Sequence, residues 1–388
     1  MSIMRICFLF LLLLWPCGLR AETLLILTSY EAEVVAPLVE AFEEAHPAIT
    51  VRHLNKNTHA AVSEILSGNE RRFDLFWASS AEAFEVLRAA GRLEDLGKGD
   101  YTDFAYSAVG WSWRSPFPGE APMEWNDLLN PALAGRIAMS HPMQSGSTHS
   151  LIETILQHRG WQAGWAWLLE LAGQLRTISA RSFGVLQGIE EGRWEVGLTI
   201  DFLALKRMNQ GFVFRYGRPI IIIPARIAVL TNGQAPAAAK SFIDFVTSPA
   251  GQRLLLHPDL RRIPVDPAIQ AELAETLIPE VRAALQFSWS SYDPVLASRR
   301  YRQVNELFDI FIARDFLRRR DLWRQLRALE EESGQHQGDL RALLTWMPLS
   351  EWEVMARAPD QDQLMDWARQ AEALLDRAEE TLAAMRRP

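Results

Sequence analysis

The sequence predicts an α/β protein that ends in an all-helical C-terminal extension, and three observations support this fold class. Short, apolar, β-prone runs alternate with segments of helical spacing through about the first 285 residues. From residue 298 to residue 385 almost every position fits helical periodicity, and β-prone runs disappear. The 388 residues, of which 48% are hydrophobic, are enough for two or three domains with cores of their own. We therefore expect the extension to occupy residues 286–388.

The first residues have the pattern of a secretory signal peptide. Residues 6–15 are all apolar, and ten residues are too few to cross a bilayer, which needs about 20. Ala21 supplies a small residue at a cleavage point, so residues 1–21 are expected to be removed on export. Lipid attachment at Cys17 is less favoured, because bulky residues precede that cysteine. Cleavage removes Cys7 and Cys17 together, and the mature chain then has no thiol for a disulfide, a nucleophile or a metal.

The first third of the mature chain alternates three strands with three helices. The predicted strands are Thr23–Leu27, Ile49–Leu54 and Phe73–Trp77, and the predicted helices are Glu33–Glu44, Ala60–Leu66 and Ala81–Ala90. Gly91 follows the third helix at a position where glycine is favoured as a C-cap. This alternation predicts parallel β-α-β units whose helices cover a buried sheet.

The middle of the chain repeats the alternation. Its predicted strands are Ala108–Trp113, Gly135–Met139, Leu175–Ser179, Glu195–Ile200 and Ile220–Leu230. Its predicted helices are Leu151–His158, Trp165–Ala172, Val185–Glu191, Ala235–Val246 and Ala250–Leu256. Ser248 and Pro249 are typical N-cap and N1 residues for the last of these helices. Trp161 and Trp165 lie four residues apart, a spacing that favours core packing over sugar stacking.

Charge is unevenly distributed along the predicted extension. Residues 299–327 carry nine arginines and four acidic residues, whereas residues 330–388 carry 13 acidic residues and six arginines. The last segment also has one apolar stripe at helical spacing. The whole chain has a formal charge of −8, which disfavours nucleic-acid binding. We therefore predict that the basic and acidic helices of the extension pair with each other.

Two segments resemble hallmarks of the type 2 periplasmic solute-binding proteins. Pro122–Met139, with its Trp-Asn-Asp-Leu run and later Gly-Arg-Ile, is similar to the segment that opens the second domain in that family. Ala237–Gln252 is similar to the late helix pair and its Ser-Pro-x-Gly-Gln turn. The resemblance implies a periplasmic location and a two-lobed type 2 fold with a hinged cleft. It places lobe 1 in residues 22–106 and 220–285, and lobe 2 in residues 107–219.

A narrower resemblance, over the full mature length, is to the regulators of phosphoglycerate transport, periplasmic partners of a membrane sensor kinase. Its most specific piece is Ala180–Val185. The other residues that carry it are His149–Val185, Leu340–Met347, Thr28-Ser29, Ser79-Ser80 and Ile200-Asp201. This resemblance implies a phosphoglycerate-like organophosphate ligand, whose bound state is presented to a sensor kinase that regulates transport. The alternative is a receptor that delivers a small anion to the permease of an ABC importer.

Four loops are expected to form the ligand site, because ligands of such folds lie at carboxyl ends of strands and amino ends of helices. The candidate ligand-binding residues are Thr28, Ser29, Tyr30, Ser79, Ser80, Ser145, Gly146, Ser147, His149, Arg181, Ser182 and Asp201. Helix N-termini and hydroxyls favour a small anion, and Gly146 allows close backbone approach. Arg181 offers a planar fork for phosphate or carboxylate, and Asp201 an acceptor for ligand hydroxyls.

Each candidate also has a purely structural interpretation. The serines and Asp201 are suitable helix caps, and Thr148 belongs with them. Arg181 is also suited to an ion pair across the lobe interface, and a residue such as His149 is more often packed on a helix than bound to a ligand. The convergence of four loops is the stronger argument for a site.

Catalysis and metal binding are not expected. The chain contains no His-Glu-x-x-His, no Gly-x-Ser-x-Gly and no phosphate loop ending in Gly-Lys-Ser/Thr. None of the six tyrosines is adjacent to another, which argues against ferric iron capture of the kind that uses neighbouring tyrosines. We expect a monomeric binding protein with a small anionic solute and a membrane partner, without cofactor, metal or nucleic acid.

Overall fold

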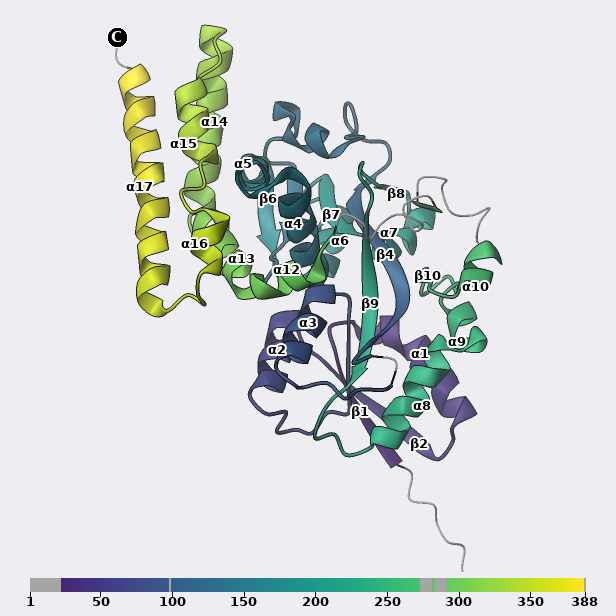
Figure 1. The fold of residues 1–388 in the computed structure, drawn as a ribbon. Coiled ribbons are helices and arrows are strands. Elements are labelled where there is room, and N and C mark those ends of the chain that lie inside the picture. Colours follow the sequence, from purple (N-terminus) through teal and green to yellow (C-terminus); the bar gives the residue numbers. More distant parts are fainter. Residues whose placement is uncertain (1–21, 98, 273–280, 283–291, 387–388) are drawn as a thin grey trace, which may run out of the picture.

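The computed structural model describes residues 22–97, 99–272, 281–282 and 292–386, as two α/β lobes flanked by helices (Figure 1). The predicted signal peptide, residues 1–21, and the predicted start of the extension at residue 286 lie outside the described residues. Within the described part of the chain, no helix combines the length and apolar character that crossing a membrane requires.

Lobe 1 contains the predicted parallel β-α-β units. Strand β1 (Glu22–Thr28) lies between β2 (Ile49–Asn55) and β3 (Leu75–Ala78) and is parallel to both. The helices that follow the three strands are α1 (Ala32–Ala45), α2 (Thr58–Leu66) and α3 (Ala81–Ala89). Gly91 follows α3 with a φ of 65°, which confirms its predicted role at the helix end.

Lobe 2 repeats this arrangement around another central strand. Strand β5 (Ile137–Ser140) lies between β6 (Leu175–Ser179) and β7 (Val196–Ile200), again in parallel. Its helices are α4 (Gly146–Arg159), α5 (Trp161–Ala172), α6 (Ser182–Glu190) and α7 (Asp201–Leu205). Short 3-10 turns span Trp125–Leu129, Pro131–Leu133 and Met208–Gln210. Trp161 and Trp165 are buried with ring centroids 5.7 Å apart, which confirms their predicted core packing.

Two long antiparallel strands connect the lobes. Strand β9 (Ile221–Val229) pairs with β3 of lobe 1, and β4 (Thr102–Arg114) pairs with both β9 and β7 of lobe 2. The strand order is therefore β2-β1-β3-β9-β4-β7-β5-β6. Strands β8 (Phe212–Arg215) and β10 (Ile263–Pro264) add to β4. The periodicity predicted parallel units but not these crossings, because strand direction depends on pairing between residues that are 85 or more positions apart.

After β9 the chain returns to lobe 1 and then forms the extension. Helices α8 (Pro236–Thr247), α9 (Pro249–Leu254) and α10 (Pro267–Glu272) follow β9, and the Ser248 side chain caps α9 as predicted. The extension contains α12 (Pro294–Arg299), α13 (Tyr301–Phe308), a π-helical turn (Asp309–Ala313), α14 (Phe316–Ser333), α15 (Gly338–Thr345), α16 (Glu351–Met355) and α17 (Gln361–Met385).

The basic and acidic parts of the extension contact each other, as their charges predict. Arg318 of α14 forms ion pairs with Asp376 and Glu379 of α17, at N–O distances of 2.5 and 2.7 Å. Beneath this ion pair, an apolar cluster joins α14, α15 and α17 around Trp323 and Leu340. The predicted intramolecular helix pairing is therefore confirmed.

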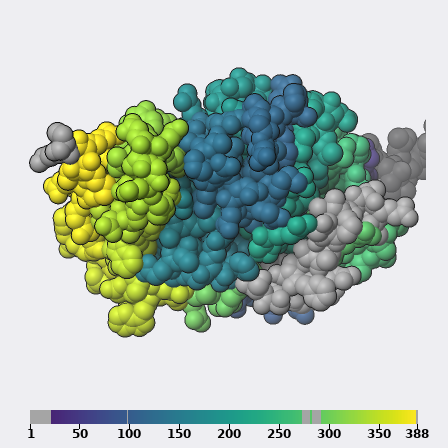
Figure 2. Space-filling view, turned by 90° about the horizontal axis from the view of Figure 1, so that it is seen from above, coloured from purple at the N-terminus to yellow at the C-terminus, as the bar shows by residue number. Residues whose placement is uncertain are grey.

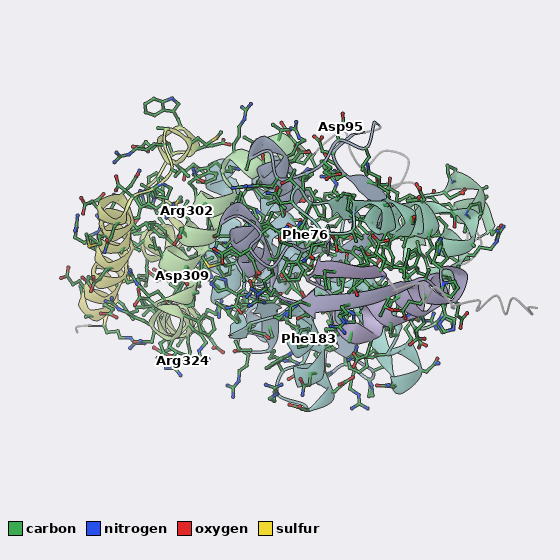
Figure 3. The ribbon with its side chains drawn as sticks, turned by 90° about the horizontal axis from the view of Figure 1, so that it is seen from below. Phe76, Asp95, Phe183, Arg302, Asp309 and Arg324 are labelled. Carbon is green, nitrogen blue, oxygen red and sulfur yellow. The ribbon has the colours of Figure 1, made fainter. Side chains whose placement is uncertain are left out.

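The extension shares one hydrophobic core with lobe 2. A single buried cluster contains Trp165 of α5 together with Phe308, Phe311 and Trp367 of the extension. Figure 2 shows the yellow-green helices packed directly against the blue-teal surface of lobe 2. In Figure 3, Asp309 and Arg324 mark the extension at one side of the molecule, away from Phe183 of lobe 2. Removing the extension would therefore expose the core of lobe 2 to water.

Candidate functional site

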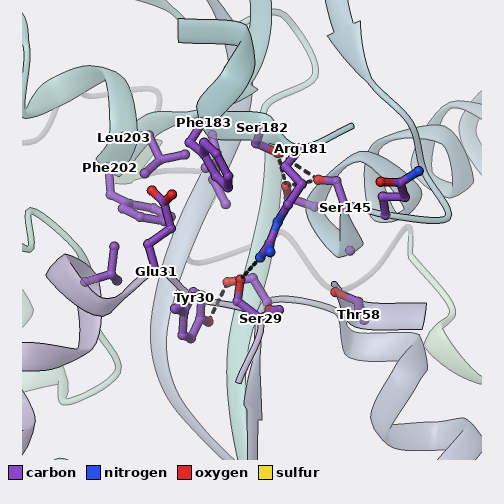
Figure 4. Close-up of a pocket in the computed structure, with 16 residues that line it drawn as sticks. Ser29, Tyr30, Glu31, Thr58, Ser145, Arg181, Ser182, Phe183, Phe202 and Leu203 are labelled. Atoms are coloured by element: carbon purple, nitrogen blue, oxygen red, sulfur yellow. Dashed lines mark hydrogen bonds between the residues drawn. The ribbon is translucent and has the colours of Figure 1, made fainter. Parts of the chain in front are cut away.

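A pocket opens between the two lobes (Figure 4). Its empty space, the open mouth included, is about 520 Å³. Lobe 1 contributes Ser29, Tyr30, Glu31, Val34, Thr58 and Ser79. Lobe 2 contributes Gln144, Ser145, Gly146, Ser147, Arg181, Ser182, Phe183, Ile200, Phe202 and Leu203. One wall is polar and the other is largely apolar.

The polar wall contains two helix N-termini that meet. Ser145 caps α4, and its Oγ lies 2.7 Å from the Oγ of Ser182, the first residue of α6. Ser147 Oγ lies 3.3 Å from the same Ser182 Oγ. Each helix N-terminus carries about half a positive charge and unpaired N–H groups, so two at one point favour an anion.

Gly146 brings the start of α4 against lobe 1. A Cβ atom at this position would come within 2.6 Å of the Ser80 Cβ and 2.8 Å of the Ser79 carbonyl oxygen. The missing side chain thus permits close contact between the lobes at the polar wall.

Arg181 extends from the start of α6 across the pocket to lobe 1. Its Nη1 donates to Asn55 Oδ1 at 2.6 Å. Its Nη2 donates to the Ser29 carbonyl at 2.7 Å (Figure 4). Burial lowers the pKa of Arg181, and the Glu31 carboxylate opposes that change. Arg181 forms no ion pair within the part of the chain that the structure describes, so the interlobe contact is a set of hydrogen bonds to neutral acceptors.

The opposite wall is apolar, and its residues were not predicted as site residues. Phe183, Phe202 and Leu203 lie here together with Val34 and Ile200. The periodicity assigned Val34 and Ile200 to a helix and a strand core, because an apolar residue that faces a cleft has the same local pattern as one that faces a core. The sequence signal was position: Phe202 and Leu203 directly follow a residue that was predicted.

Three more polar residues of the pocket were also missed: Glu31, Thr58 and Gln144. Burial and the neighbouring Glu33 carboxylate raise the pKa of Glu31. Glu31 and Gln144 lie beside predicted residues, so a wider window would have included them, whereas Thr58 follows the second strand, whose end was not among the four predicted loops.

Eight of the 12 predicted residues line the pocket. The structure brings together Ser29, Tyr30, Ser79, Ser145, Gly146, Ser147, Arg181 and Ser182. It places Thr28, Ser80, His149 and Asp201 behind the pocket wall. Thr28 donates from its hydroxyl to the Trp77 carbonyl at 2.8 Å, and Ser80 donates to Glu82 at 3.3 Å at the start of α3.

His149 is buried on the side of α4 that faces the extension. Its Nδ1 lies 3.0 Å from Asn305 Oδ1, and its ring centroid lies 4.4 Å from that of Tyr301. The predicted start of this helix at Leu151 is wrong. Ser145 caps the helix, which therefore begins at Gly146, five residues earlier than predicted. His149 is therefore a helical residue whose side chain is held by packing and by Asn305.

Asp201 lies at the end of β7, where β4 crosses between the lobes. Its carboxylate accepts hydrogen bonds from the backbone N–H groups of Ala108 and Phe202 at 2.9 and 2.7 Å. The Tyr216 hydroxyl donates to it at 3.4 Å. Burial raises the pKa of Asp201 to about 7.

This raised pKa predicts a pH-dependent stability. Between its ordinary pKa of 3.8 and about 7, Asp201 keeps a proton in the folded protein that the unfolded chain has lost. The free energy of unfolding should therefore fall as pH rises through this window, by up to about 4 kcal/mol from this group. Urea unfolding of the wild-type and Asp201→Asn proteins at pH 5 and pH 8 measures the contribution. The wild-type protein should lose more stability than the variant between these values, and equal losses would contradict the assignment.

The described residues contain no group of three or more His, Cys, Asp or Glu side chains placed to hold a metal ion.

Comparison with known proteins places this geometry in context. The family model described as bacterial extracellular solute-binding protein matches residues 24–257. The phosphoglycerate transport regulatory protein PgtC of Salmonella typhimurium is 28% identical over 355 residues, which cover 86% of this chain and 87% of that protein.

Solved structures show the same fold at lower identity. The periplasmic binding protein AfuA from Actinobacillus pleuropneumoniae, with fructose-6-phosphate bound, is 15% identical with a TM-score of 0.59, covering 64% of this chain and 86% of that one. The sulfate-binding protein SubI from Mycobacterium tuberculosis is 19% identical with a TM-score of 0.57, covering 67% and 93%. These likenesses establish the two-lobed fold.

Proposed function

We propose, on the premise that this chain belongs to the family of bacterial extracellular solute-binding proteins, that its cleft binds a small anionic solute of the phosphoglycerate type. We further propose that the protein works in the periplasm after removal of residues 1–21, and that a membrane sensor kinase regulating transport reads its bound state. The role is binding and presentation rather than catalysis. The observation that carries the proposal is the meeting of two helix N-termini and Arg181 at one wall of the cleft.

The polar wall supports an anionic ligand through its unused donors. The hydroxyls of Ser147 and Ser182 bond only to other side-chain hydroxyls, so they can turn toward an oxyanion without breaking helical structure, while Ser145 keeps its role as the cap of α4. Arg181 has hydrogen bonds only to neutral acceptors and keeps further N–H groups for phosphate or carboxylate. The eight predicted residues that line the pocket are our proposed ligand contacts. The remaining four support the wall from behind.

The extension contacts α4, the helix that starts at the polar wall of the pocket. This contact supports the proposal that the extension presents the ligand-bound state to a membrane partner. Helix α4 begins in the pocket, and three positions later His149 bonds Asn305 of α13. One turn further, Glu153 forms a buried ion pair with Arg300.

The same part of the chain also contacts lobe 1, where the Tyr292 hydroxyl donates to Glu82 at 2.8 Å. Helix α12 packs against α3 of that lobe. Hinge motion between the lobes must therefore rearrange contacts of the extension. This gives a membrane partner a surface that differs between open and closed forms.

The name of the relative from Salmonella typhimurium supports both the ligand class and the regulatory role. A receptor for an ABC importer shares the cleft and is the competing proposal. The two differ in which process a ligand-binding variant interrupts: induction of transport genes for a sensor, solute uptake alone for an importer receptor. Truncation before residue 290 is a poor test, because the extension shares its core with lobe 2.

Calorimetry of residues 22–388 with 3-phosphoglycerate tests the ligand. We expect saturable heat for one site and an increased melting temperature, with glycerol as the uncharged control that gives neither. No heat and no thermal shift at millimolar 3-phosphoglycerate would overturn the proposal. In cells, a transport-gene reporter that still responds in a strain carrying a ligand-binding variant would favour the importer role.

A further inference from the structure

Arg262 is a buried cation that the proposed ligand contacts do not use. It lies between α9 and β10, and only 3% of its surface is exposed. Its backbone N–H donates to the Leu255 carbonyl at 2.9 Å, and the next residue, Ile263, pairs with Tyr106 of β4. The backbone that carries this arginine is therefore held at the strand that crosses between the lobes.

The guanidinium of Arg262 lies directly behind the wall of the ligand pocket. Its Cζ is 3.9 Å from the ring centroid of Phe202 and 4.4 Å from that of Tyr30. Both rings line the pocket. The arginine thus stacks on the rear of two residues whose other side faces the ligand space.

Neither terminal nitrogen of Arg262 has a hydrogen bond of good geometry to a described residue, and its looser contact with the Tyr30 hydroxyl opposes the rise in the pKa of that phenol. Buried polar groups are almost always paired, and an unpaired buried guanidinium costs more free energy than a neutral group. Stacking on two aromatic rings recovers part of this cost but supplies no counter-charge. Such an uncompensated charge is typical of a functional position.

The charged groups around Arg262 do not neutralise it. Asp201 is the nearest acidic influence, but it accepts hydrogen bonds from Ala108, Phe202 and Tyr216 instead, and its pKa of about 7 leaves it partly protonated at neutral pH. Lys206 adds a second positive charge, and the proximity of Arg262 contributes to lowering the pKa of that lysine. The Asp259 and Glu33 carboxylates act on Lys206, whereas no carboxylate among the described residues forms a hydrogen bond with Arg262.

We infer that Arg262 is a specificity-determining residue, which selects ligands carrying a second anionic group in addition to the one held at the polar wall. This inference rests on the proposed function and deepens it. The polar wall at α4 and α6 holds the first anion, and the field of Arg262 stabilises the second through the wall of Tyr30 and Phe202. Tyr30 transmits part of the effect: its phenol bonds Ser79 at 2.7 Å, and Arg262 opposes the burial that raises its pKa. A charge acting in a partly desolvated cleft is screened less than in water.

Two ligands that differ only at the second anion provide the test. In 3-phosphoglycerate a carboxylate stands where glycerol 3-phosphate has a hydroxymethyl group, and the phosphate ends are the same. Calorimetry of wild-type residues 22–388 should give a roughly tenfold to thirtyfold preference for 3-phosphoglycerate. In R262M this preference should fall to threefold or less, mainly through weaker binding of 3-phosphoglycerate. R262K retains the charge and should restore part of the preference.

Arg261→Met is the matched control, because Arg261 is the neighbouring arginine and its side chain is exposed. It should keep the wild-type preference.

A merely structural role for Arg262 predicts that R262M weakens the binding of both ligands equally, and that result would overturn the inference while leaving the proposed function intact. Equal affinity of the wild-type protein for both ligands would overturn it as well. If the wild-type protein binds neither ligand, the proposed function fails first. Should R262M not fold, R262Q, which also removes the charge, carries the same comparison against R262K.

Discussion

Replacing Arg181 with methionine is expected to weaken 3-phosphoglycerate binding by roughly 30- to 150-fold, equivalent to about 2–3 kcal/mol. Arg181 is the pocket residue whose guanidinium enters from lobe 2 and reaches lobe 1. The substitution removes a charge-assisted contact to the ligand, and methionine keeps the length of the aliphatic chain. The acceptors left behind, Asn55 Oδ1 and the Ser29 carbonyl, are at the pocket where water or ligand can replace the lost donors.

Calorimetry measures this loss, and a melting curve checks that the variant is folded. Arg159→Met is the control, since Arg159 lies in the last turn of α4, far along the helix from the pocket, and should leave the affinity within twofold. An affinity of the Arg181→Met protein within threefold of wild type would show that the guanidinium does not hold the ligand. The proposed anion site would then rest on helix N-termini alone.

Replacing Arg300 with methionine is expected to lower the free energy of unfolding by about 3–5 kcal/mol. Arg300 and Glu153 are both almost fully buried, and their side chains approach to 2.8 Å. Arg300 also bonds Glu351 and stacks over Trp161, with its Cζ 5.2 Å from the ring centroid. The single substitution leaves the Glu153 carboxylate buried without its counter-charge, which is the costly outcome.

Urea unfolding measures this effect, and a second substitution separates the cause. In the double variant Arg300→Met with Glu153→Leu, no buried unpaired charge remains, because the Glu351 side chain that also loses its partner is 39% exposed to water, so most of the lost stability should return. Arg299→Met changes the preceding, exposed arginine and should alter stability by no more than about 0.5 kcal/mol. A double variant as unstable as the single one would mean that packing, rather than the unpaired carboxylate, accounts for the loss.

The fold was largely predictable because its signals are local. The hydrophobic period of a strand such as Ile49–Leu54 or of its neighbouring helices can be read from a few consecutive residues. The same holds for a helix end, such as the one marked by Gly91. The opposite charges of α14 and α17 likewise predicted their pairing, and Arg318 confirms it. Both β4 and β9 were predicted as strands, but their antiparallel direction was not. The apolar pattern of a strand is the same in either direction.

The residues of the candidate site were likewise predictable only where their signals are local. Ser145 and Ser182 were predicted because small polar residues follow strands and precede helices, a pattern visible in sequence. His149 and Asp201 share that pattern, yet the structure turns them away from the pocket toward Asn305 and Ala108. Phe183 and Phe202 carry no such pattern and were found only in three dimensions.

The sequence by itself determined the order of strands and helices, the helical end of the chain and the loops from which a site would be built. Those properties follow from hydrophobic period, capping and charge along a short stretch of chain. Only the tertiary structure decided that Arg181 crosses to lobe 1, that the extension shares the core of lobe 2, and that Arg262 is buried against the rings of Phe202 and Tyr30. Burial and pairing depend on residues brought together from distant parts of the chain, and no local pattern encodes which of them will meet.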